Sequence, residues 1–125
     1  MKLGRVVNGK TFEILELLCD QEIPIKTAYK LKNMVSKLRE QQVKYENMRK
    51  AGLESYGSRN PDGSLETDVK GNVQFTEDNI NKFVKELNTA LDTEFDIEPI
   101  KVNELGKKVT IRTKDLESLD GLIIE

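Results

Sequence analysis

The chain has 125 residues, 37% of them hydrophobic and 34% charged, and its net charge is −2 at neutral pH. One cysteine and no histidine exclude an intrachain disulfide framework, a multi-thiolate metal site and catalysis through an imidazole base. No apolar segment approaches the roughly 18 residues that a membrane span needs, and the first residues open no secretory signal. We therefore expect one cytoplasmic domain over residues 1–125, with no metal, no other cofactor and no membrane partner.

Charge is divided unevenly between the two halves of the chain. Residues 1–57 carry 11 basic and 7 acidic side chains, whereas residues 58–125 carry 9 basic and 15 acidic ones. Residues 26–50 hold eight basic side chains against only Glu40 and Glu46. Such a run is a solvated helix face, a surface that packs on an acidic half of a neighbouring subunit, or a binding surface for phosphates or an acidic partner.

The N-terminal segment predicts a strand followed by a helix. Residues 2–7 predict a short strand that ends in the Asn8-Gly9 turn, because both turn residues tolerate a positive φ. Thr11 is expected to cap a short helix, whose nearly continuous apolar residues predict burial on more than one side. Cys19, at the end of this helix, is expected to pack as a small hydrophobic side chain.

The main feature is a helix predicted from Pro24 to Tyr56. Proline suits the first turn of a helix, and the residues that follow are good helix formers with no further proline. A stripe at every third or fourth position is apolar up to Leu38 and mixed beyond it. Such a helix would be about 45 Å long, whereas a compact chain of this length has a radius of gyration of about 14 Å. It would therefore extend beyond its domain, break near residues 40–42, or pack on another chain. We favour the first and third outcomes, and so expect a homo-oligomer or a protein partner.

The next forty residues predict a turn-rich connection and a second helix. Gly57 is expected to end the long helix in the left-handed conformation. Two short polar strands are predicted near residues 65–69 and 72–75, and no internal repeat is recognised. Thr76 is expected to cap a helix that runs to about Phe95 and has a clean apolar face.

The C-terminal segment predicts strands and a last short helix. Residues 97–102 and 108–112 are the predicted strands, and residues 113–119 are the predicted helix. Pro99 fits an edge strand or a strand start. Taken together, the elements predict an α+β fold, a helix-dominated single domain with one long central helix and a small antiparallel sheet.

One phosphate-binding motif matches in full. Residues 4–11 fit G-x-x-x-x-G-K-[ST], the P-loop pattern. Its context argues against a P-loop, because Val6-Val7 favours extended backbone where the loop must curl, and the rest of the chain does not alternate strands with helices. We interpret the segment as a strand, an Asn-Gly turn and the start of a helix.

Two further patterns give weak indications of metal or acid–base chemistry. Setting Gly63 at the sixth position of a calcium loop places Ser58 and Val69 where carboxylates are required, so a β-turn is the better interpretation. Acidic pairs on alternate residues, such as Asp96 and Glu98, are interpreted as surface charge. Because Cys19 has no histidine to activate it, we expect the chain not to be an enzyme.

The candidate binding residues lie on the long helix. Lysines recur at seven-residue steps along one side of it, and its tyrosines are candidates for stacking on bases. The pI of about 5.4 argues against a nucleic-acid-binding module, which we keep as a third alternative. A phosphorylated small molecule or an acidic protein surface fits the basic stretch equally well. The proposed contact residues are Lys30, Lys37, Lys44, Tyr45, Arg49, Lys50 and Tyr56.

The order of these signals resembles that of a group of small uncharacterised proteins of tailed bacteriophages. The residues that carry the resemblance are Ile23-Pro24, the lysine-rich stretch 30–50 with its Tyr45-Glu46-Asn47-Met48-Arg49 segment, Asp62-Gly63 and the helix over 75–91. The resemblance spans most of the chain, is one of layout, and carries no catalytic residues. It implies a phage protein that works in the infected bacterial cytoplasm or in the virion.

These observations lead to two expected functions. The first is a non-enzymatic phage accessory protein that binds and inhibits a host defence protein or sequesters a phosphorylated signal. The alternative is a virion or assembly component that packs through its long helix.

Overall fold

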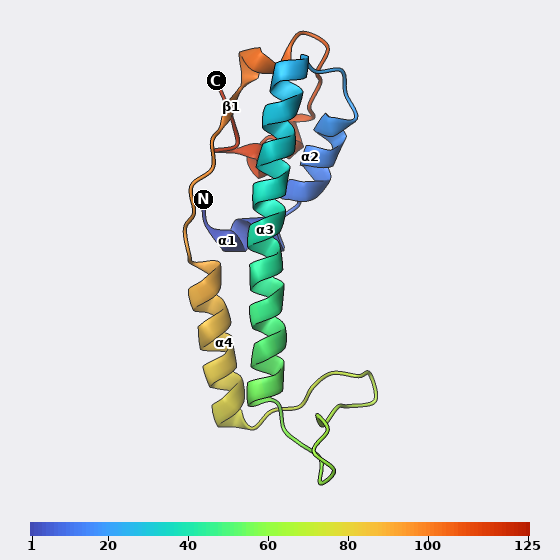
Figure 1. Ribbon diagram of the computed structural model, residues 1–125, viewed down its shortest axis with the longest axis vertical. Helices are drawn as coiled ribbons and strands as arrows, with labels where there is room; N and C mark the ends of the chain where they lie inside the picture. Colours follow the sequence, from blue (N-terminus) through green and yellow to red (C-terminus); the bar gives the residue numbers. More distant parts are fainter.

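The computed structural model describes residues 1–125 as an elongated molecule built along one helix (Figure 1). A head surrounds the N-terminal half of this helix, a two-helix stalk contains its C-terminal half, and an arm over residues 58–75 projects beyond the end of the stalk. The elements in chain order are α1 (Leu3–Asn8), α2 (Thr11–Cys19), α3 (Ile25–Tyr56), α4 (Glu77–Leu91), β1 (Ile100–Lys101), η1 (Val102–Leu105), η2 (Thr113–Asp115), η3 (Glu117–Leu119) and β2 (Ile123–Ile124).

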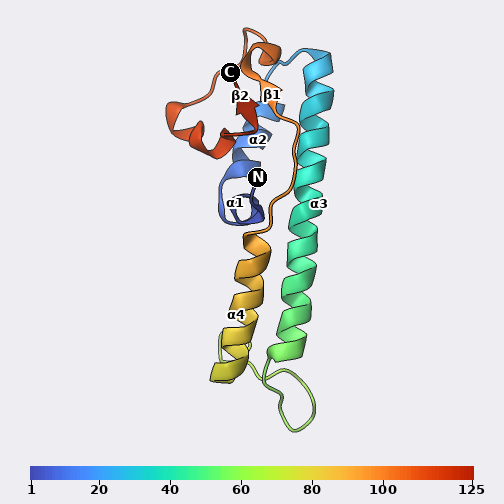
Figure 2. The same ribbon diagram turned by 90° about the vertical axis from the view of Figure 1, so that its left-hand side faces the viewer.

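The prediction of a long helix is confirmed. Helix α3 is continuous over 32 residues, which corresponds to about 48 Å, and the break considered near residues 40–42 does not occur. Pro24 precedes the first helical residue, and its carbonyl accepts the Ala28 amide. The other elements all lie on one side of α3 (Figure 2). The opposite side is solvent-exposed, and we call it the outer face of α3; it runs through Ile25, Tyr29, Ser36, Val43 and Lys50.

The head holds the main core. Its apolar side chains come from α1, α2, the N-terminal half of α3 and the C-terminal segment, so the two ends of the chain close the core together. The buried residues are Val6, Ile14, Leu15, Leu18, Leu31, Met34, Leu38, Ile100, Leu105, Leu119 and Leu122.

The expected strand over residues 2–7 is wrong, because this segment forms helix α1. Leu3 and Val6 are both buried, and a spacing of three places them on one side of a helix. Gly4 lets α1 approach the end of α4, since a Cβ at this position would lie 3.2 Å from the Leu91 Cβ and carbonyl oxygen. Tertiary packing therefore outweighs the strand preference of the Val6-Val7 pair. The expected cap is also displaced, because Lys10 precedes α2 and the buried Thr11 hydroxyl donates to the Ser118 carbonyl instead.

The predicted antiparallel sheet is wrong in its direction. Strands β1 and β2 form a two-residue parallel pair with Ile100 opposite Ile123. The predicted strand over 108–112 does not form, and the chain instead crosses from β1 through the short helical turns before it returns as β2. Gln21 explains why no strand is needed there: its side-chain amide donates to the Thr110 carbonyl at 2.9 Å and accepts the Thr110 amide at 2.8 Å. One side chain therefore satisfies the backbone groups that a neighbouring strand would otherwise pair.

The stalk consists of α4 packed beside the C-terminal half of α3. Thr76 caps α4 as predicted, accepting the Asn79 amide at 3.3 Å, but the helix ends at Leu91 rather than near Phe95. Of its expected apolar face only Phe83 is buried, against Gly52 of α3. A Cβ at Gly52 would overlap the Phe83 ring, so glycine is required there for close approach.

The arm contains an internal repeat that the sequence pattern did not reveal. Ser58, Glu66 and Gln74, each eight positions apart, form a closed ring: Ser58 donates to Gln74, Gln74 to Glu66, and Glu66 to Ser58, each at 2.8 Å between backbone atoms. The expected strands shrink to isolated antiparallel bridges beside this ring. Gly57 enters the arm with a negative φ, contrary to the expected left-handed conformation. It is glycine because a Cβ would lie 2.6 Å from the Leu53 carbonyl oxygen.

Candidate functional site

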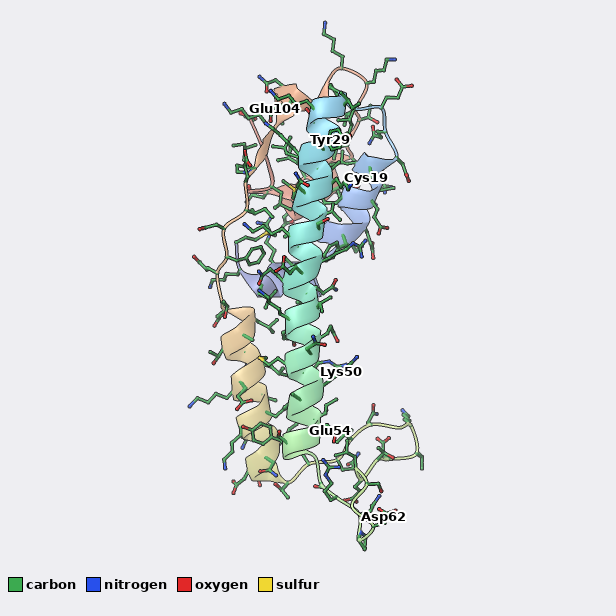
Figure 3. All side chains as sticks on the ribbon, in the orientation of Figure 1. Cys19, Tyr29, Lys50, Glu54, Asp62 and Glu104 are labelled. Atoms are coloured by element: carbon green, nitrogen blue, oxygen red, sulfur yellow. The ribbon has the colours of Figure 1, made fainter.

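The seven predicted contact residues do not form one surface. Helical periodicity places Lys30, Lys37 and Lys44 along one side of α3, whereas the buried Tyr45 points into the stalk and Lys50 lies on the outer face (Figure 3). The structure therefore separates the predicted site into at least three directions, and each residue has its own surroundings.

Lys30 is occupied by an internal ion pair. Its ammonium lies 2.7 Å from Glu104, whose other carboxylate oxygen accepts the Lys101 amide at 3.0 Å. The hydrogen bond between Lys30 and Glu104 raises the pKa of the lysine and holds the pKa of the carboxyl below its usual range. The buried Thr27 hydroxyl adds a bond to the Glu104 carbonyl at 2.7 Å. These contacts fasten the start of α3 to η1, which is a structural role.

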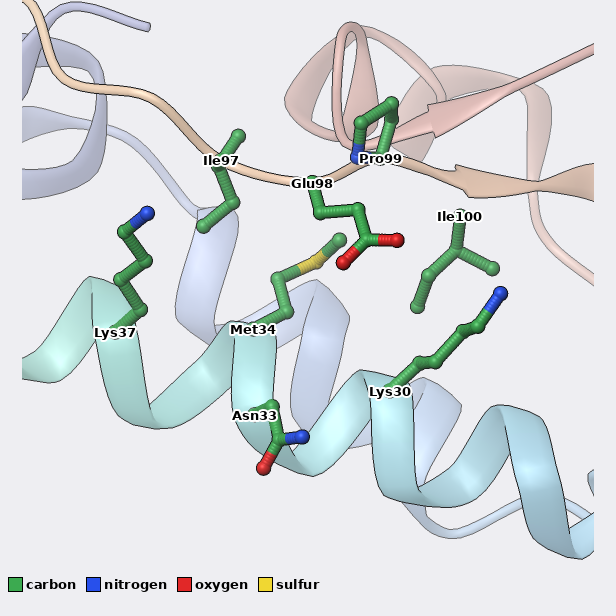
Figure 4. Close-up of a pocket in the computed structure, with 8 residues that line it drawn as sticks. All are labelled: Lys30, Asn33, Met34, Lys37, Ile97, Glu98, Pro99 and Ile100. Carbon is green, nitrogen blue, oxygen red and sulfur yellow. The ribbon is translucent and has the colours of Figure 1, made fainter.

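Lys37 borders a small pocket beside the segment that leads from α4 to β1 (Figure 4). The pocket has a volume of about 180 Å³, and Met34, Ile97 and Ile100 supply its apolar lining. The Glu98 side chain points toward α3 between Lys30 and Lys37. Since Glu98 and Glu104 balance the two lysines, the pocket offers no net positive charge for a phosphate.

The two predicted stacking residues of the stalk are both engaged within the chain. Tyr45 is only 8% exposed. The Tyr56 hydroxyl donates to Glu86 of α4, and this bond raises its pKa; its ring meets Phe83 edge-on with centroids 6.2 Å apart. Of the three tyrosines of α3 considered for stacking on bases, these two are engaged within the chain, and Tyr29, which is 62% exposed, remains accessible.

Of the remaining predicted cations, Lys44 and Arg49 form ion pairs within α3, and Lys50 does not. Lys44 lies 3.7 Å from Glu40 and Arg49 lies 3.6 Å from Glu46, both as exposed pairs along the helix. Such exposed ion pairs contribute little to the stability of the fold, and their charged groups remain accessible to solvent. Lys50 has no acidic side chain within ion-pair distance, and it projects from the outer face (Figure 3).

A more accessible surface lies on the outer face of α3, beside the predicted contact residues. Ile25 is 77% exposed and Tyr29 is 62% exposed, and both lie on the outer face in the head half of α3. Residues 25–39 contain five cations and no acidic residue. Of these cations, Lys26, Lys32 and Lys37 make no ion pair. We call the surface formed by Ile25, Tyr29, Lys26 and Lys32 the basic patch; Lys37 faces the pocket that contains Glu98.

The sequence contained a signal for the basic patch. Positions 25, 29, 32 and 36 follow steps of three and four, and they lie opposite the stripe that contains the buried Leu31 and Leu38. An isoleucine and a tyrosine on the polar side of an amphipathic helix indicate an exposed apolar surface at Ile25 and Tyr29. The seven-residue lysine pattern drew attention to the neighbouring side instead.

The motifs considered in the sequence are resolved by local geometry. Residues 4–8 of the P-loop match lie in helix α1, so no loop is available to wrap a phosphate. Residues 58–69 form part of the arm, where Asp62 and Asp68 accept hydrogen bonds within their own turns. No three histidine, cysteine, aspartate or glutamate side chains gather where they could hold a metal ion.

Comparison with known protein families, curated proteins and solved structures finds no match to this chain. None of its helices combines the length and the apolar character required to cross a membrane. Function is therefore inferred from the chain's own surfaces.

Proposed function

We propose that the chain is a non-enzymatic binding protein that uses the basic patch to engage an acidic surface of a protein partner. One observation carries the proposal: residues 25–39 of α3, a helix whose outer face is exposed, hold five cations and no acidic residue, and two large apolar side chains stand exposed among them. Exposed tyrosine and isoleucine are suited to serve as anchors that a partner buries. Free ammonium groups around them attract and orient an acidic partner.

The charge distribution favours a different protein over a second copy of the chain along α3. Parallel pairing of two α3 helices would set the five cations of one copy against the five of the other. Antiparallel pairing would set them against residues 40–56, which contain three basic and three acidic side chains. Neither arrangement supplies the negative charge that the patch requires. We therefore keep assembly through α3 as the second alternative.

The phage resemblance extends the proposal to a biological setting. In that setting the partner is a host protein in the infected bacterium, and the chain inhibits it by occupying its surface. Sequestration of a phosphorylated signal is less well supported, because Lys30 is paired with Glu104 and Lys37 shares its pocket with Glu98.

The proposal is tested by affinity capture from the bacterial host with three forms of the chain. The first is the natural chain, the second carries Lys26→Glu with Tyr29→Ala, and the third is a matched control with Lys82→Glu and Lys85→Glu on α4. All four positions are exposed, so circular dichroism should be unchanged. We expect the natural chain and the control to retain the same acidic proteins, and the patch variant to lose them.

Two results contradict this assignment. Equal capture by the patch variant shows that partners bind elsewhere. A nucleotide-sized mass retained by the natural chain in native mass spectrometry, with no protein captured, supports the signal-sequestering function instead.

A further inference from the structure

Beside the basic patch, a groove separates α2 from α3. It has a volume of about 300 Å³, and its apolar lining includes Ile23, Leu31 and Val35. Two cations of α3, Lys32 and Arg39, stand on its rim, and Cys19 of α2 stands at its lip. The groove is thus an apolar slot with positive charge along its α3 side.

The two rim cations are arranged differently. Arg39 is held in place, because its guanidinium lies 3.0 Å from Glu16 and 5.1 Å from the centre of the Phe12 ring. Lys32 has no acidic partner and is exposed. Glu16 and Asp20 are the acidic groups nearest the lip, and Glu16 is already engaged by Arg39. The α3 wall therefore presents two cations beside an apolar floor, and Lys32 is the one without an acidic partner.

The spacing of the two cations on the rim determines which partner segment fits the groove. Lys32 and Arg39 lie seven residues apart on one side of α3, a separation of about 10.5 Å. Val35, on the floor, lies between them in sequence. A partner helix that lies along α3 would match both cations with two carboxylates seven positions apart. It would place an apolar side chain in the groove from the third or fourth position between them.

We propose that the groove between α2 and α3 binds an acidic amphipathic segment of a protein partner. Two carboxylates of that segment pair with Lys32 and Arg39, and one apolar side chain enters the slot over Leu31 and Val35. This inference rests on the proposed function, since it names the part of the partner that the head recognises. The acid-free stretch of α3 supplies the charge complementarity that selects this occupant.

The test uses a displayed library of random 15-residue peptides, selected on the full chain held by a C-terminal tag. We expect enrichment of peptides with two acidic residues seven positions apart and an apolar residue at the third or fourth position between them. Enriched peptides should slow alkylation of Cys19 at the lip. Failure to enrich any peptide, or enrichment of peptides without this pattern, overturns the proposal.

Variants locate the binding site of the selected peptides. Lys32→Glu should weaken an enriched peptide by about tenfold or more, because it replaces an attraction by a repulsion at one end of the segment. Val35→Glu should weaken it further by putting a charge on the apolar floor, and Arg39→Gln tests the second cation without reversing its charge. The control with Lys82→Glu and Lys85→Glu should bind normally. Unchanged binding by both Lys32→Glu and Val35→Glu places the peptide elsewhere and overturns the proposal.

Two outcomes separate this inference from the proposed function. If capture of partners depends on Lys26 and Tyr29 but not on Lys32 or Val35, the proposed function stands and the proposal about the groove is overturned. A second copy is the other possible occupant, because the exposed side of α2 carries Glu13, Leu17 and Asp20 at the required spacing. A concentration-dependent oligomer in analytical ultracentrifugation that Val35→Glu dissolves would assign the groove to that copy and overturn the partner assignment.

Discussion

The head and the stalk share one helix, yet they are stabilised very differently. In the head, α3 is one wall of a core of eleven buried side chains that α1, α2 and the C-terminal segment complete. In the stalk, α3 meets α4 alone, and the buried residues of this pair are Tyr45, Gly52 and Phe83. Two helices in contact can bury only one stripe each. Most of the buried apolar surface therefore lies in the head, and we expect the head to contribute most of the free energy of unfolding.

The difference also has a consequence for dynamics. Segments with few buried apolar contacts open locally at lower free energy than a closed core. At the far end of the stalk, the Phe75 ring of the arm stacks on the Phe83 ring of α4 with centroids 5.4 Å apart. Opening of α4 should therefore precede unfolding of the head.

The largest predicted effect is a cavity in the head. Leu15 is fully buried, so Leu15→Ala should lower the free energy of unfolding by about 2–5 kcal/mol. The matched change in the stalk, Leu87→Ala, removes a partly exposed side chain. It should lower the free energy of unfolding by clearly less than Leu15→Ala does. Urea denaturation followed by circular dichroism measures both. Equal losses would mean that stalk and head unfold as one core, contrary to the comparison.

Overpacking of the stalk is the second effect. Gly52→Ala places a Cβ in the space of the Phe83 ring, and we expect a net loss of about 1–3 kcal/mol, although alanine favours the helix itself by about 1 kcal/mol. In the Phe83→Ala background the clash is gone, so the same change should become stabilising. A double-mutant cycle measured by urea denaturation reads this sign reversal. Additive costs would show that Gly52 and Phe83 are not in contact in solution.

The local sequence pattern correctly predicted the elements whose conformation is determined mainly by their own residues. Helix α3 follows from uninterrupted helix formers after Pro24, and the start of α4 follows from the Thr76 cap. The errors fall where a distant residue decides the conformation. Gln21 replaces a strand partner for Thr110 from 89 positions away. Helix α1 comes close to Leu91 at Gly4, where a Cβ would lie 3.2 Å from the Leu91 Cβ.

The candidate site shows the same limit. Periodicity correctly grouped Lys30, Lys37 and Lys44 on one side of α3. It could not show that Glu98 and Glu104 return to that side from the far end of the chain. In the arm, by contrast, the sequence does carry a trace of the repeat, because Gly63 and Gly71 stand eight positions apart. The structure shows that both have a positive φ.

The third prediction concerns the amide that replaces a strand. Gln21→Ala removes both bonds to Thr110, and because these groups are exposed we expect a loss of about 1 kcal/mol. The adjacent control, Glu22→Ala, removes the exposed pair with Lys108 and should cost less. Hydrogen exchange at the Thr110 amide should accelerate in the first variant and stay unchanged in the second. Equal acceleration in both would show that the Gln21 amide does not protect this segment.

The smallest predicted effect is a loosening of the arm in acid. Asp62 accepts from the Ser64 hydroxyl and amide, and Asp68 accepts from the amides of Asn72 and Lys70. These bonds hold the pKa of each carboxyl below its usual range, the Ser64 hydroxyl contributing most for Asp62 and the Asn72 amide most for Asp68. A depressed pKa in the folded state stabilises the turn above the unfolded value of about 4. That stabilisation is lost as the pH falls through the folded pKa.

Nuclear magnetic resonance can follow this loss residue by residue. As the pH is lowered from about 5, the Lys70 and Asn72 amides should shift and exchange faster with solvent before amides of the head do. Asp68→Asn should abolish the pH dependence of these two amides while that of the Ser64 amide persists, because Asp62 still titrates. One turn lies between residues 58 and 66 of the ring and the other between residues 66 and 74, so simultaneous loss of both turns in the variant would show that the ring couples them. The arm would then open as one unit.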